Sequence, residues 1–323
     1  MKRDFLSIAD WSSKELLQIL DLSKKMKANP KKYSKSLEGK SVALIFEKPS
    51  LRTHVTFEVG IKQLGANVVY LTQADISLGK RESIYDVAKN LERWVDAVVI
   101  RTFEQKNVDS LARHAQISIV NALTDFEHPC QAVGDFLTIQ EHLGSFKGKK
   151  LAWIGDGNNV CHSVMLMAAK VGMDFIAITP IGFLPDLNVI KKAQEFAAVN
   201  DTKIQLSSDP IEGIREADII YTDVWVSMGQ ESNYDTKMKA FSGFQVNANL
   251  MKKAKPSAIF MHCLPAHRGQ EVTDEVMDSP QSVVFDEAEN RLHTQKAIMY
   301  TLLKEQNRKK LPVNKNRRAT RNR

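Results

Sequence analysis

The chain has 323 residues, of which 43% are hydrophobic and 26% charged, a composition typical of a soluble globular protein long enough for two domains. No apolar run approaches the roughly 18 residues that a membrane helix needs, and no apolar segment typical of a secretory signal follows the charged start. Three scattered cysteines, Cys130, Cys161 and Cys263, argue against a disulfide framework, so we expect a cytoplasmic protein.

The formal net charge of +7 is concentrated at the C-terminus. Residues 304–323 contain nine Lys or Arg and one acid, a net charge of +8, so the rest of the chain has a net charge of −1. We expect residues 308–323 to form a solvated, disordered tail. The alternative is an arm that binds nucleic acid or an acidic partner, but the tail has no aromatic residue to stack on bases.

Short apolar runs alternate with longer segments of helical period along most of the chain. The apolar runs predict strands at residues 41–46, 67–71, 96–101, 117–121, 150–155, 174–179, 218–223 and 258–262. The segments between them predict helices at residues 53–63, 83–94, 108–115, 129–142, 159–171 and 188–199. This alternation predicts an α/β fold with two doubly wound parallel-sheet domains, each with helices on both faces of its sheet.

A connection that contains Gly and Lys interrupts this alternation at residues 143–150. We therefore expect a first domain at residues 1–146 and a second at residues 147–290. The segment 291–307 has helical spacing, and we expect it to pack back on the first domain before the tail begins.

Polar clusters follow the ends of several predicted strands, where open α/β sheets bind their ligands. In the first cluster, Ser50, Leu51, Arg52 and Thr53 lie between a strand and a helix. The N–H groups of a helix start, two hydroxyls and a guanidinium suit a phosphate. The alternative is an ordinary helix cap with Arg52 on a solvated face. The segment is not a Walker loop, because it lacks the glycines and the Gly-Lys-Ser/Thr sequence.

Three more strand ends carry candidate side chains. Arg101 is either a second clamp for an anion or a surface residue. His128 and Gln131 begin a helix and suit a carbonyl and an amide group; the alternative is a capped helix with a buried His. Asp223 could hold an ammonium group beside a polar loop at residues 227–228, or it could cap a helix.

The sequence Gly-Asp-Gly at residues 155–157 suggests a dinucleotide-binding fingerprint. Val160 stands where the third glycine belongs, and the next predicted strand ends without the acidic residue that a ribose needs. Asn158 and Asn159, at the start of a helix, could instead bind a small polar substrate.

The stretch MHCLPAHRG, at residues 261–269, brings His262, Cys263 and His267 together. A zinc site would need a fourth ligand, and neighbouring residues of a strand point to opposite faces. A nucleophilic Cys would need a base and an oxyanion site. A structural role, or a polar site where the thiol or main chain orients a substrate, remains open.

The motifs SLRTH, RTF, HPCQ, GDGNN, DVWVSMG, HCLP and DEAENR occur in this order. Together they resemble the ornithine carbamoyltransferase family, over roughly residues 1–303. The resemblance implies a carbamoyl-phosphate-binding domain at residues 1–146, an ornithine-binding domain at residues 147–290 and an active site in the cleft between them. It also implies a homotrimer or a multiple of trimers.

The resemblance implies roles for individual residues. Catalytic roles fall on Arg52, Arg101, His128, Asp223 and Cys263. The carbamoyl-phosphate site would comprise Ser50, Leu51, Arg52, Thr53, Arg101, His128, Gln131, Cys263, Leu264 and Arg291. The ornithine site would comprise Asn159, Asp223, Ser227 and Met228. No metal or other cofactor is implied.

Two segments depart from the family pattern. Leu51 and His54 replace the second and fifth residues of the family's Ser-Thr-Arg-Thr-Arg motif. Leu51 still supplies its N–H, so we expect phosphate binding to survive with one hydroxyl fewer. The loop that the family lends to a neighbouring subunit falls on residues 75–83, where Ser77, Lys80 and Arg81 are the candidates to reach across.

The resemblance therefore predicts an enzyme of arginine metabolism that transfers the carbamoyl group of carbamoyl phosphate to the side-chain amine of L-ornithine. The products would be L-citrulline and phosphate, formed by direct attack without a covalent enzyme intermediate. Putrescine, N-acetylornithine and aspartate are alternative acceptors. A dinucleotide-binding oxidoreductase and a protein that binds nucleic acid through its tail are alternatives from other classes.

Overall fold

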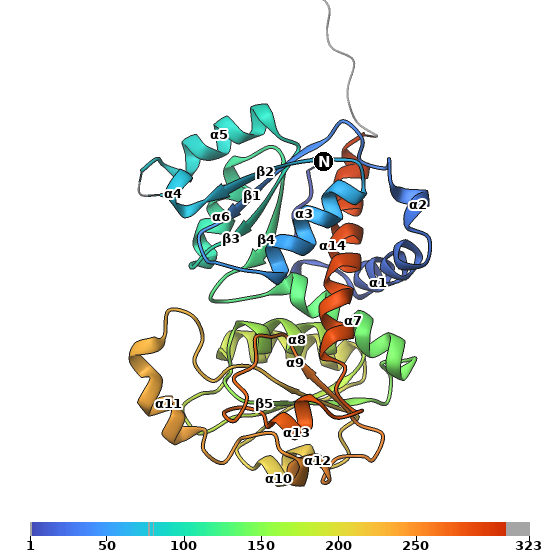
Figure 1. The fold of residues 1–323 in the computed structure, drawn as a ribbon, viewed down its shortest axis with the longest axis vertical. Coiled ribbons are helices and arrows are strands. Elements are labelled where there is room, and N and C mark those ends of the chain that lie inside the picture. The colour runs from blue at the N-terminus through green and yellow to red at the C-terminus, as the bar shows by residue number, and fades with distance from the viewer. Residues whose placement is uncertain (1, 77, 80, 308–323) are drawn as a thin grey trace, which may run out of the picture.

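The computed structural model describes residues 2–76, 78–79 and 81–307, and it contains two parallel sheets surrounded by helices (Figure 1). The strand orders are β2-β1-β3-β4 and β7-β6-β5-β8-β9. The predicted α/β fold with two parallel-sheet domains is confirmed. The strands are β1 (Ser41–Phe46), β2 (Asn67–Thr72), β3 (Ala97–Arg101), β4 (Ser118–Leu123), β5 (Lys150–Ile154), β6 (Asp174–Ile178), β7 (Ile204–Ser207), β8 (Ile219–Thr222) and β9 (Ile259–His262).

The strands other than the edge strands β2 and β7 form because their apolar residues are buried on both faces of each sheet. In β1, Val42 and Leu44 belong to one buried cluster, whereas Ala43 and Ile45 belong to another. Side chains along a strand alternate between its faces, so a continuous apolar run supplies both clusters. The same alternation divides the second sheet.

The helices include all six that the periodicity predicts, with bounds shifted by up to three residues. They are α3 (Arg52–Gln63), α5 (Ile84–Trp94), α6 (Gln105–His114), α7 (Pro129–Leu143), α8 (Asn159–Val171) and α9 (Leu187–Val199). The shorter helices are η1 (Ile8–Asp10), α2 (Pro30–Tyr33), α4 (Gln73–Ile76), α10 (Pro210–Ile214), η2 (Glu231–Asn233), α11 (Tyr234–Ala240), α12 (Ala248–Met251) and α13 (Asp274–Met277).

Besides these shorter helices, helix α1 (Ser13–Ala28) and strand β7 were not predicted from the sequence. Helix α1 begins at a capping box, in which Ser12 and Glu15 each accept a backbone N–H of the other. It buries one face, including Leu16, Ile19 and Met26. Strand β7 forms the edge of the second sheet and is largely exposed, so it lacks the apolar run that identifies the other strands.

The last helix, α14 (Val284–Asn307), joins the two parts of the chain. It follows β9 of the second sheet and packs against α1, α3 and α7 beside the first sheet (Figure 1). It begins seven residues before the segment predicted to be helical. One buried cluster includes residues of both sheets together with α7, α8 and α14, so the two sheets share a hydrophobic core.

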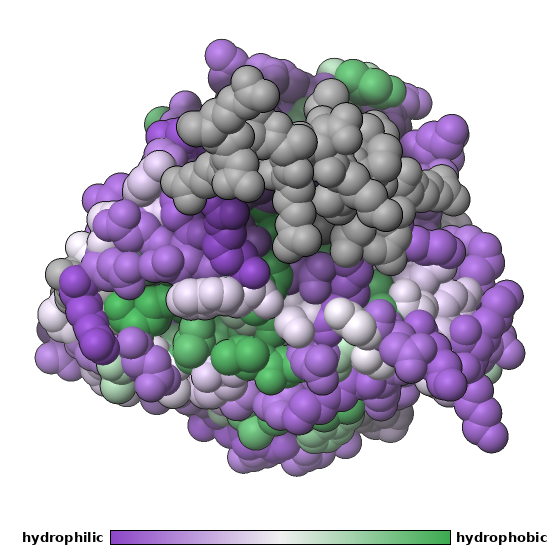
Figure 2. Space-filling view, turned by 90° about the horizontal axis from the view of Figure 1, so that it is seen from above, coloured by the Kyte–Doolittle hydropathy of each residue, from purple (hydrophilic) through white to green (hydrophobic). Residues whose placement is uncertain are grey.

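The surface is mainly hydrophilic on the face seen in Figure 2, with apolar residues gathered in one area. Single apolar side chains such as Trp94 and Phe285 are also exposed. Among the helices of the described residues, none is long and apolar enough to cross a membrane. The predicted tail at residues 308–323 lies outside the described residues, as do Ser77 and Lys80.

Candidate active site

A cavity of about 760 Å³ lies where loops from the two sheets meet. It is lined from the first sheet by residues after β1 and β4 and by the last residue of β3, and from the second by residues after β5, β8 and β9. The predicted site residues that line it are Ser50, Leu51, Arg52, Thr53, Arg101, His128, Gln131, Asn159, Asp223, Ser227, Met228, Cys263, Leu264 and Arg291. Arg81 does not line the cavity; its guanidinium lies 3.4 Å from the carbonyl oxygen of Asp75.

The turn between β1 and α3 opens into the cavity. The Thr53 N–H donates to Ser50 Oγ over 3.2 Å, while Leu51 at the helix start makes no side-chain cap. The side chain of Leu51 is 73% exposed, so it takes no part in the core. The start of α3 at Arg52 and Thr53 lines the cavity, and the free N–H groups of a helix start are favourable for an anion.

Three arginines, Arg52, Arg101 and Arg291, converge on the same part of the cavity. Burial lowers the pKa of Arg101 to about 10, and the charges of Arg291 and Arg52 add to the effect. Burial, followed by Arg291, Arg101 and Arg52, also holds the pKa of His128 well below its usual value, so its imidazole is neutral. Within the described residues, none of the three arginines forms an ion pair with a carboxylate.

Three of the buried polar atoms there have no hydrogen-bond partner among the described residues: Arg101 Nε, His128 Nδ1 and Arg291 Nε. A buried donor without a partner is destabilising by about 1–3 kcal/mol, so such groups need an explanation. Together with the convergent arginines, they indicate a site arranged for a strongly anionic ligand with further acceptor oxygens.

Arg291 is held by groups from two other helices. It donates one hydrogen bond to Gln131 Oε1 on α7 and another to Thr53 Oγ1 on α3, the latter over 3.1 Å. Gly134, one turn after Gln131, permits this approach, because a Cβ at that position would lie 2.8 Å from Arg291 Cδ. The sequence between Pro129 and Leu143 thus combines a polar helix start with a small residue where Arg291 crosses it.

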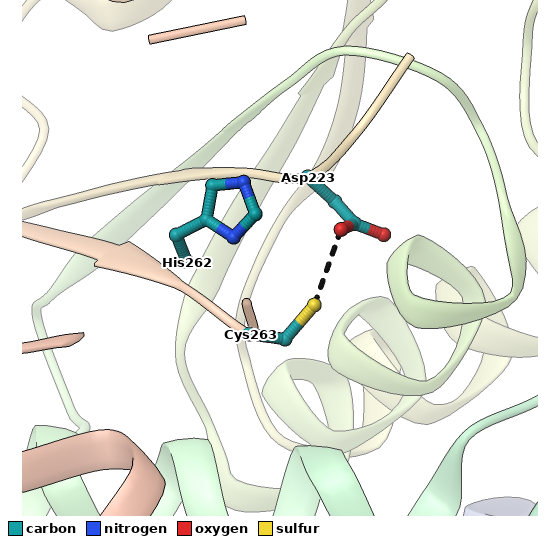
Figure 3. Close-up of side chains that lie close together, drawn as sticks. All are labelled: Asp223, His262 and Cys263. Atoms are coloured by element: carbon teal, nitrogen blue, oxygen red, sulfur yellow. Dashed lines mark hydrogen bonds between the residues drawn. The ribbon is translucent and has the colours of Figure 1, made fainter. Parts of the chain in front are cut away.

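On the other side of the cavity, Asp223 is the common acceptor. Figure 3 shows Cys263 Sγ directed at Asp223, with 3.2 Å between Sγ and Oδ1. Asn158 Nδ2 donates to the other carboxylate oxygen over 2.8 Å. Burial and the charge of Asp223 raise the pKa of Cys263 well above its usual value, so the thiol stays protonated and donates. The thiolate that nucleophilic catalysis requires is therefore disfavoured.

Asp223, His262 and Cys263 could each offer an atom to a metal ion, and these atoms lie within 4.8 Å of one another. Both ring nitrogens of His262 already have partners, however. Nδ1 accepts the Leu264 N–H over 2.9 Å, and Nε2 lies 3.1 Å from Glu271 Oε1. Binding a metal would break one of these buried contacts. His267, considered for zinc from the sequence, is not part of this group.

Several residues of the cavity were not selected from the sequence. Lys48 is buried and forms an ion pair with Asp125. Lys237 Nζ donates to Asp156 over 2.6 Å and to Gln230 over 2.7 Å. Asp156 stands in the Gly-Asp-Gly sequence that suggested a dinucleotide, but here its carboxylate binds a lysine. No sequence pattern near Lys237 marks it as a site residue, because its partner Asp156 is 81 residues away in the sequence.

Comparison with known proteins agrees with this arrangement. The family model for the carbamoyl-P binding domain of aspartate/ornithine carbamoyltransferases matches residues 3–141, and the model for the Asp/Orn binding domain matches residues 147–302. The chain therefore belongs to the aspartate/ornithine carbamoyltransferase family. Membership in this family of enzymes displaces the oxidoreductase considered from the sequence.

The similar relatives carry a more specific name. Ornithine carbamoyltransferase of Pyrococcus abyssi is 49% identical over 303 residues, which are 93% of this chain and 96% of the relative. That of Carboxydothermus hydrogenoformans is 50% identical, over 93% and 97% of the two chains. The solved ornithine carbamoyltransferase of Pyrococcus furiosus has a TM-score of 0.91 and 48% identity, over 94% and 97%. A structure of an N-acetyl-L-ornithine transcarbamylase mutant complexed with PALAO has a TM-score of 0.85 and 31% identity, over 93% and 99%.

Proposed function

We propose that this chain is an ornithine carbamoyltransferase, which transfers the carbamoyl group of carbamoyl phosphate to the side-chain amine of L-ornithine. The observation that carries the proposal is the composition of the cavity. Three arginines without carboxylate partners among the described residues face the Asp223 carboxylate and the protonated Cys263 thiol across one space. Relatives of that name at about 50% identity support the same assignment.

The arginine side is the proposed site for carbamoyl phosphate. Ser50, Thr53 and the N–H of Leu51 would bind the phosphate oxygens, while Arg52 and Arg101 balance their charge. Hydrogen bonds to a charged group are the strongest kind that this site can form. His128, as a neutral imidazole, would donate to the carbamoyl oxygen without adding to the repulsion among the arginines. Gln131, Arg291 and the main chain of Cys263 and Leu264 would hold the rest of the carbamoyl group.

The opposite side is the proposed site for ornithine. Asp223, Asn159, Ser227 and Met228 line it. The reactive nitrogen must be neutral, and a free alkylammonium has a pKa of about 10.4, so only about one molecule in a thousand is ready at neutral pH. Asp223 and Cys263 would orient this amine toward the carbamoyl carbon.

The reaction itself is a direct displacement. The amine nitrogen forms a bond to the carbamoyl carbon, and the bond from that carbon to the phosphate oxygen breaks with its electron pair leaving on phosphate. The departing phosphate is the proposed acceptor of the amine proton. The arginines favour this step because negative charge grows on the oxygens that they face. Cys263 acts as an orienting residue, and a trapped carbamoyl-thioester would contradict that role.

We further propose a cytoplasmic homotrimer, or a multiple of trimers, in which Ser77, Lys80 or Arg81 reaches a neighbouring cavity. Arg81 is exposed and does not line this chain's own cavity, and both observations support the proposal. We also retain the domain division at residues 146 and 290 as a proposal, with residues 291–307 assigned to the first domain.

The test is citrulline formation from carbamoyl phosphate and L-ornithine, with putrescine, N-acetylornithine and aspartate as parallel acceptors. Turnover with ornithine alone is the expected result. Turnover with N-acetylornithine alone would keep the carbamoyl-phosphate site and replace the proposed ornithine site. Absence of turnover with every acceptor would contradict the function and would point to Leu51 and His54, the two departures from the family motif.

A further inference from the structure

Two buried carboxyl groups lie behind the cavity and share the same hydrogen-bond donors. Asp135 on α7 and Glu287 on α14 are 0% and 1% exposed. Gln131 Nε2 lies 2.7 Å from Asp135 Oδ1 and 3.2 Å from Glu287 Oε1. Tyr221 Oη lies 3.1 Å from Asp135 Oδ2 and 3.0 Å from Glu287 Oε1. Neither carboxyl forms an ion pair within the described residues, and neither lines the cavity.

The number of protons available limits how these groups can be arranged. Tyr221 has one hydroxyl proton, so it can donate to only one of the two carboxyls. The two carboxyls are also within hydrogen-bond reach of each other, so a proton held by one of them can satisfy the remaining contacts. Glu287 also accepts the main-chain N–H of His262 over 3.0 Å. It thus has donors from Tyr221, Gln131 and His262, which suits a carboxylate. Among the described residues, a main-chain N–H reaches Glu287 and none reaches the Asp135 carboxyl, so we assign the proton of the pair to Asp135, which donates it to the Tyr221 oxygen.

The surroundings favour one negative charge rather than two. Burial raises the pKa of Asp135 and of Glu287, and for Glu287 the charge of Asp135 adds to the effect. Tyr221 and Cys263 stay neutral because burial raises the pKa of both. Arg291 is the cation acting on Asp135. A pair with a single negative charge therefore balances the buried Arg291.

The pair also decides which way the Gln131 amide faces. Because Nε2 donates to the two carboxyls, Oε1 must face Arg291 and accept its hydrogen bond. Arg291 in turn reaches Thr53 at the phosphate turn. On the other side, Glu287 fixes the main chain at His262, next to Cys263 and Leu264. The same two carboxyls thus contact Gln131, which holds Arg291 on one side of the cavity, and the main chain of His262 on the other side.

We infer that Asp135 and Glu287 form a carboxyl pair that holds one proton through Tyr221 and acts as a set of positioning residues for the transfer reaction. The pair fixes Gln131 and Arg291 beside the carbamoyl-phosphate site and the turn at residues 262–264 beside the ornithine site. For the identity of the substrates, this inference rests on the proposed function.

The arrangement predicts that two conservative substitutions differ in effect. In Asp135→Asn, the amide N–H replaces the carboxyl proton that Tyr221 accepts, and the amide oxygen still accepts from Gln131. In Glu287→Gln, the negative charge is lost and an N–H must face either His262 N–H or the donors of Tyr221 and Gln131. We expect kcat to fall less than about tenfold for Asp135→Asn and more than about a hundredfold for Glu287→Gln.

The control is Glu289→Gln, an exposed position on the same helix, which should leave kcat within about twofold of the parent. Melting temperatures are measured for every variant. If Glu287→Gln fails to fold, Tyr221→Phe replaces it, because this change keeps the ring and removes only the proton link; kcat should then fall about tenfold or more. Equal losses for Asp135→Asn and Glu287→Gln, in step with their melting temperatures, would overturn the inference.

A second readout detects the shared proton directly and does not depend on turnover. The infrared difference spectrum of parent minus Asp135→Asn, at neutral pH, should contain the carbonyl stretch of a protonated carboxyl. Its absence would overturn the shared proton. A parent that shows this band but makes no citrulline would contradict the proposed function while leaving the proton pair intact, so the two failures are distinguishable.

Discussion

The two sides of the cavity differ in whether their charged side chains have partners within the protein. On the side proposed to bind carbamoyl phosphate, Arg52, Arg101 and Arg291 face one another without carboxylate partners among the described residues. On the side proposed to bind ornithine, Asp223 is already bonded to Cys263 and Asn158, and Asp156 to Lys237. One side is therefore incomplete until an anion binds, whereas the other is satisfied by its own protein and must exchange partners when a substrate enters.

This difference has an energetic consequence. Burial, and after it the charges of Arg291 and Arg52, lower the pKa of Arg101. Holding these charges together therefore opposes folding, and a bound phosphate would offset both the burial and the repulsion. The internally bonded side gains less from binding, because each new hydrogen bond replaces an existing one. We therefore expect substitutions on the arginine side to affect catalysis most.

The largest effect is expected for Arg101→Met, which keeps much of the side-chain volume and removes the charge. We expect kcat/KM for carbamoyl phosphate to fall by about a thousandfold, since a charge that stabilises the transition state in a water-poor site is lost. Steady-state citrulline assays measure this. Arg215→Met, at a position 63% exposed in its side chain, is the matched control and should behave like the parent. A fall in kcat/KM of less than tenfold would contradict the expectation that the arginine side matters most for catalysis.

On the side that contains Asp223, whose charged groups are bonded within the protein, Asp223→Asn should have the next largest effect. The amide can still accept from one of Cys263 and Asn158, but its N–H faces the other donor and it has no charge to attract an ammonium group. We expect kcat/KM for ornithine to fall by about a hundredfold. The binding of carbamoyl phosphate, followed by calorimetry, should change little. A parallel loss of carbamoyl-phosphate affinity would show that the two sides are not separate.

A smaller kinetic effect is expected for Lys237→Met. This change leaves Asp156 buried without its ion-pair partner and releases Gln230 on the loop before α11. We expect KM for ornithine to rise about tenfold and the protein to lose about 3 kcal/mol of unfolding free energy. Lys239→Met, exposed on the same helix, is the control. Unchanged stability would mean that Asp156 finds another partner.

The smallest effect concerns stability and pH. Glu127 accepts from Ser7, Ile8 and Ser163, which join the chain start to α8, and burial raises its pKa from 4.5 to about 7. Between these pH values the folded chain retains a proton that the unfolded chain releases, so stability falls as pH rises through this window. Glu127→Gln cannot titrate, and we expect it to remove up to about 3 kcal/mol of this dependence.

Urea unfolding of parent and Glu127→Gln across pH 4.5 to 7 checks this sign. The difference between the two curves isolates Glu127 from the other buried acids. Parallel curves over the whole window would show that the carboxyl ionises equally in both states.

The strand ends could be read from the sequence because strands buried on both faces are continuous apolar runs, and the polar residues after them form the cavity. Arg52, Arg101 and Asp223 were found in this way. Edge strand β7 could not be found, since Gln205 and Leu206 are exposed. Asp135 and Glu287, which lie on helices, were also missed. In a sequence, an acidic residue of a helix is normally assigned to the face exposed to solvent, and nothing in the pattern shows that these two are buried. Their role depends on Tyr221, which is 86 residues from Asp135 in the sequence.

Helix α14 also constrains the order in which the protein can be made. A chain is synthesised from its N-terminus, so both sheets leave the ribosome before Glu287 and Arg291 do. Until then α1, α3 and α7 lack the helix that packs against all three, and the cavity lacks one of its cations. No nascent fragment that stops before residue 284 can therefore hold a finished site. A stop codon there would spare every strand found in the described residues, and we expect it to abolish turnover.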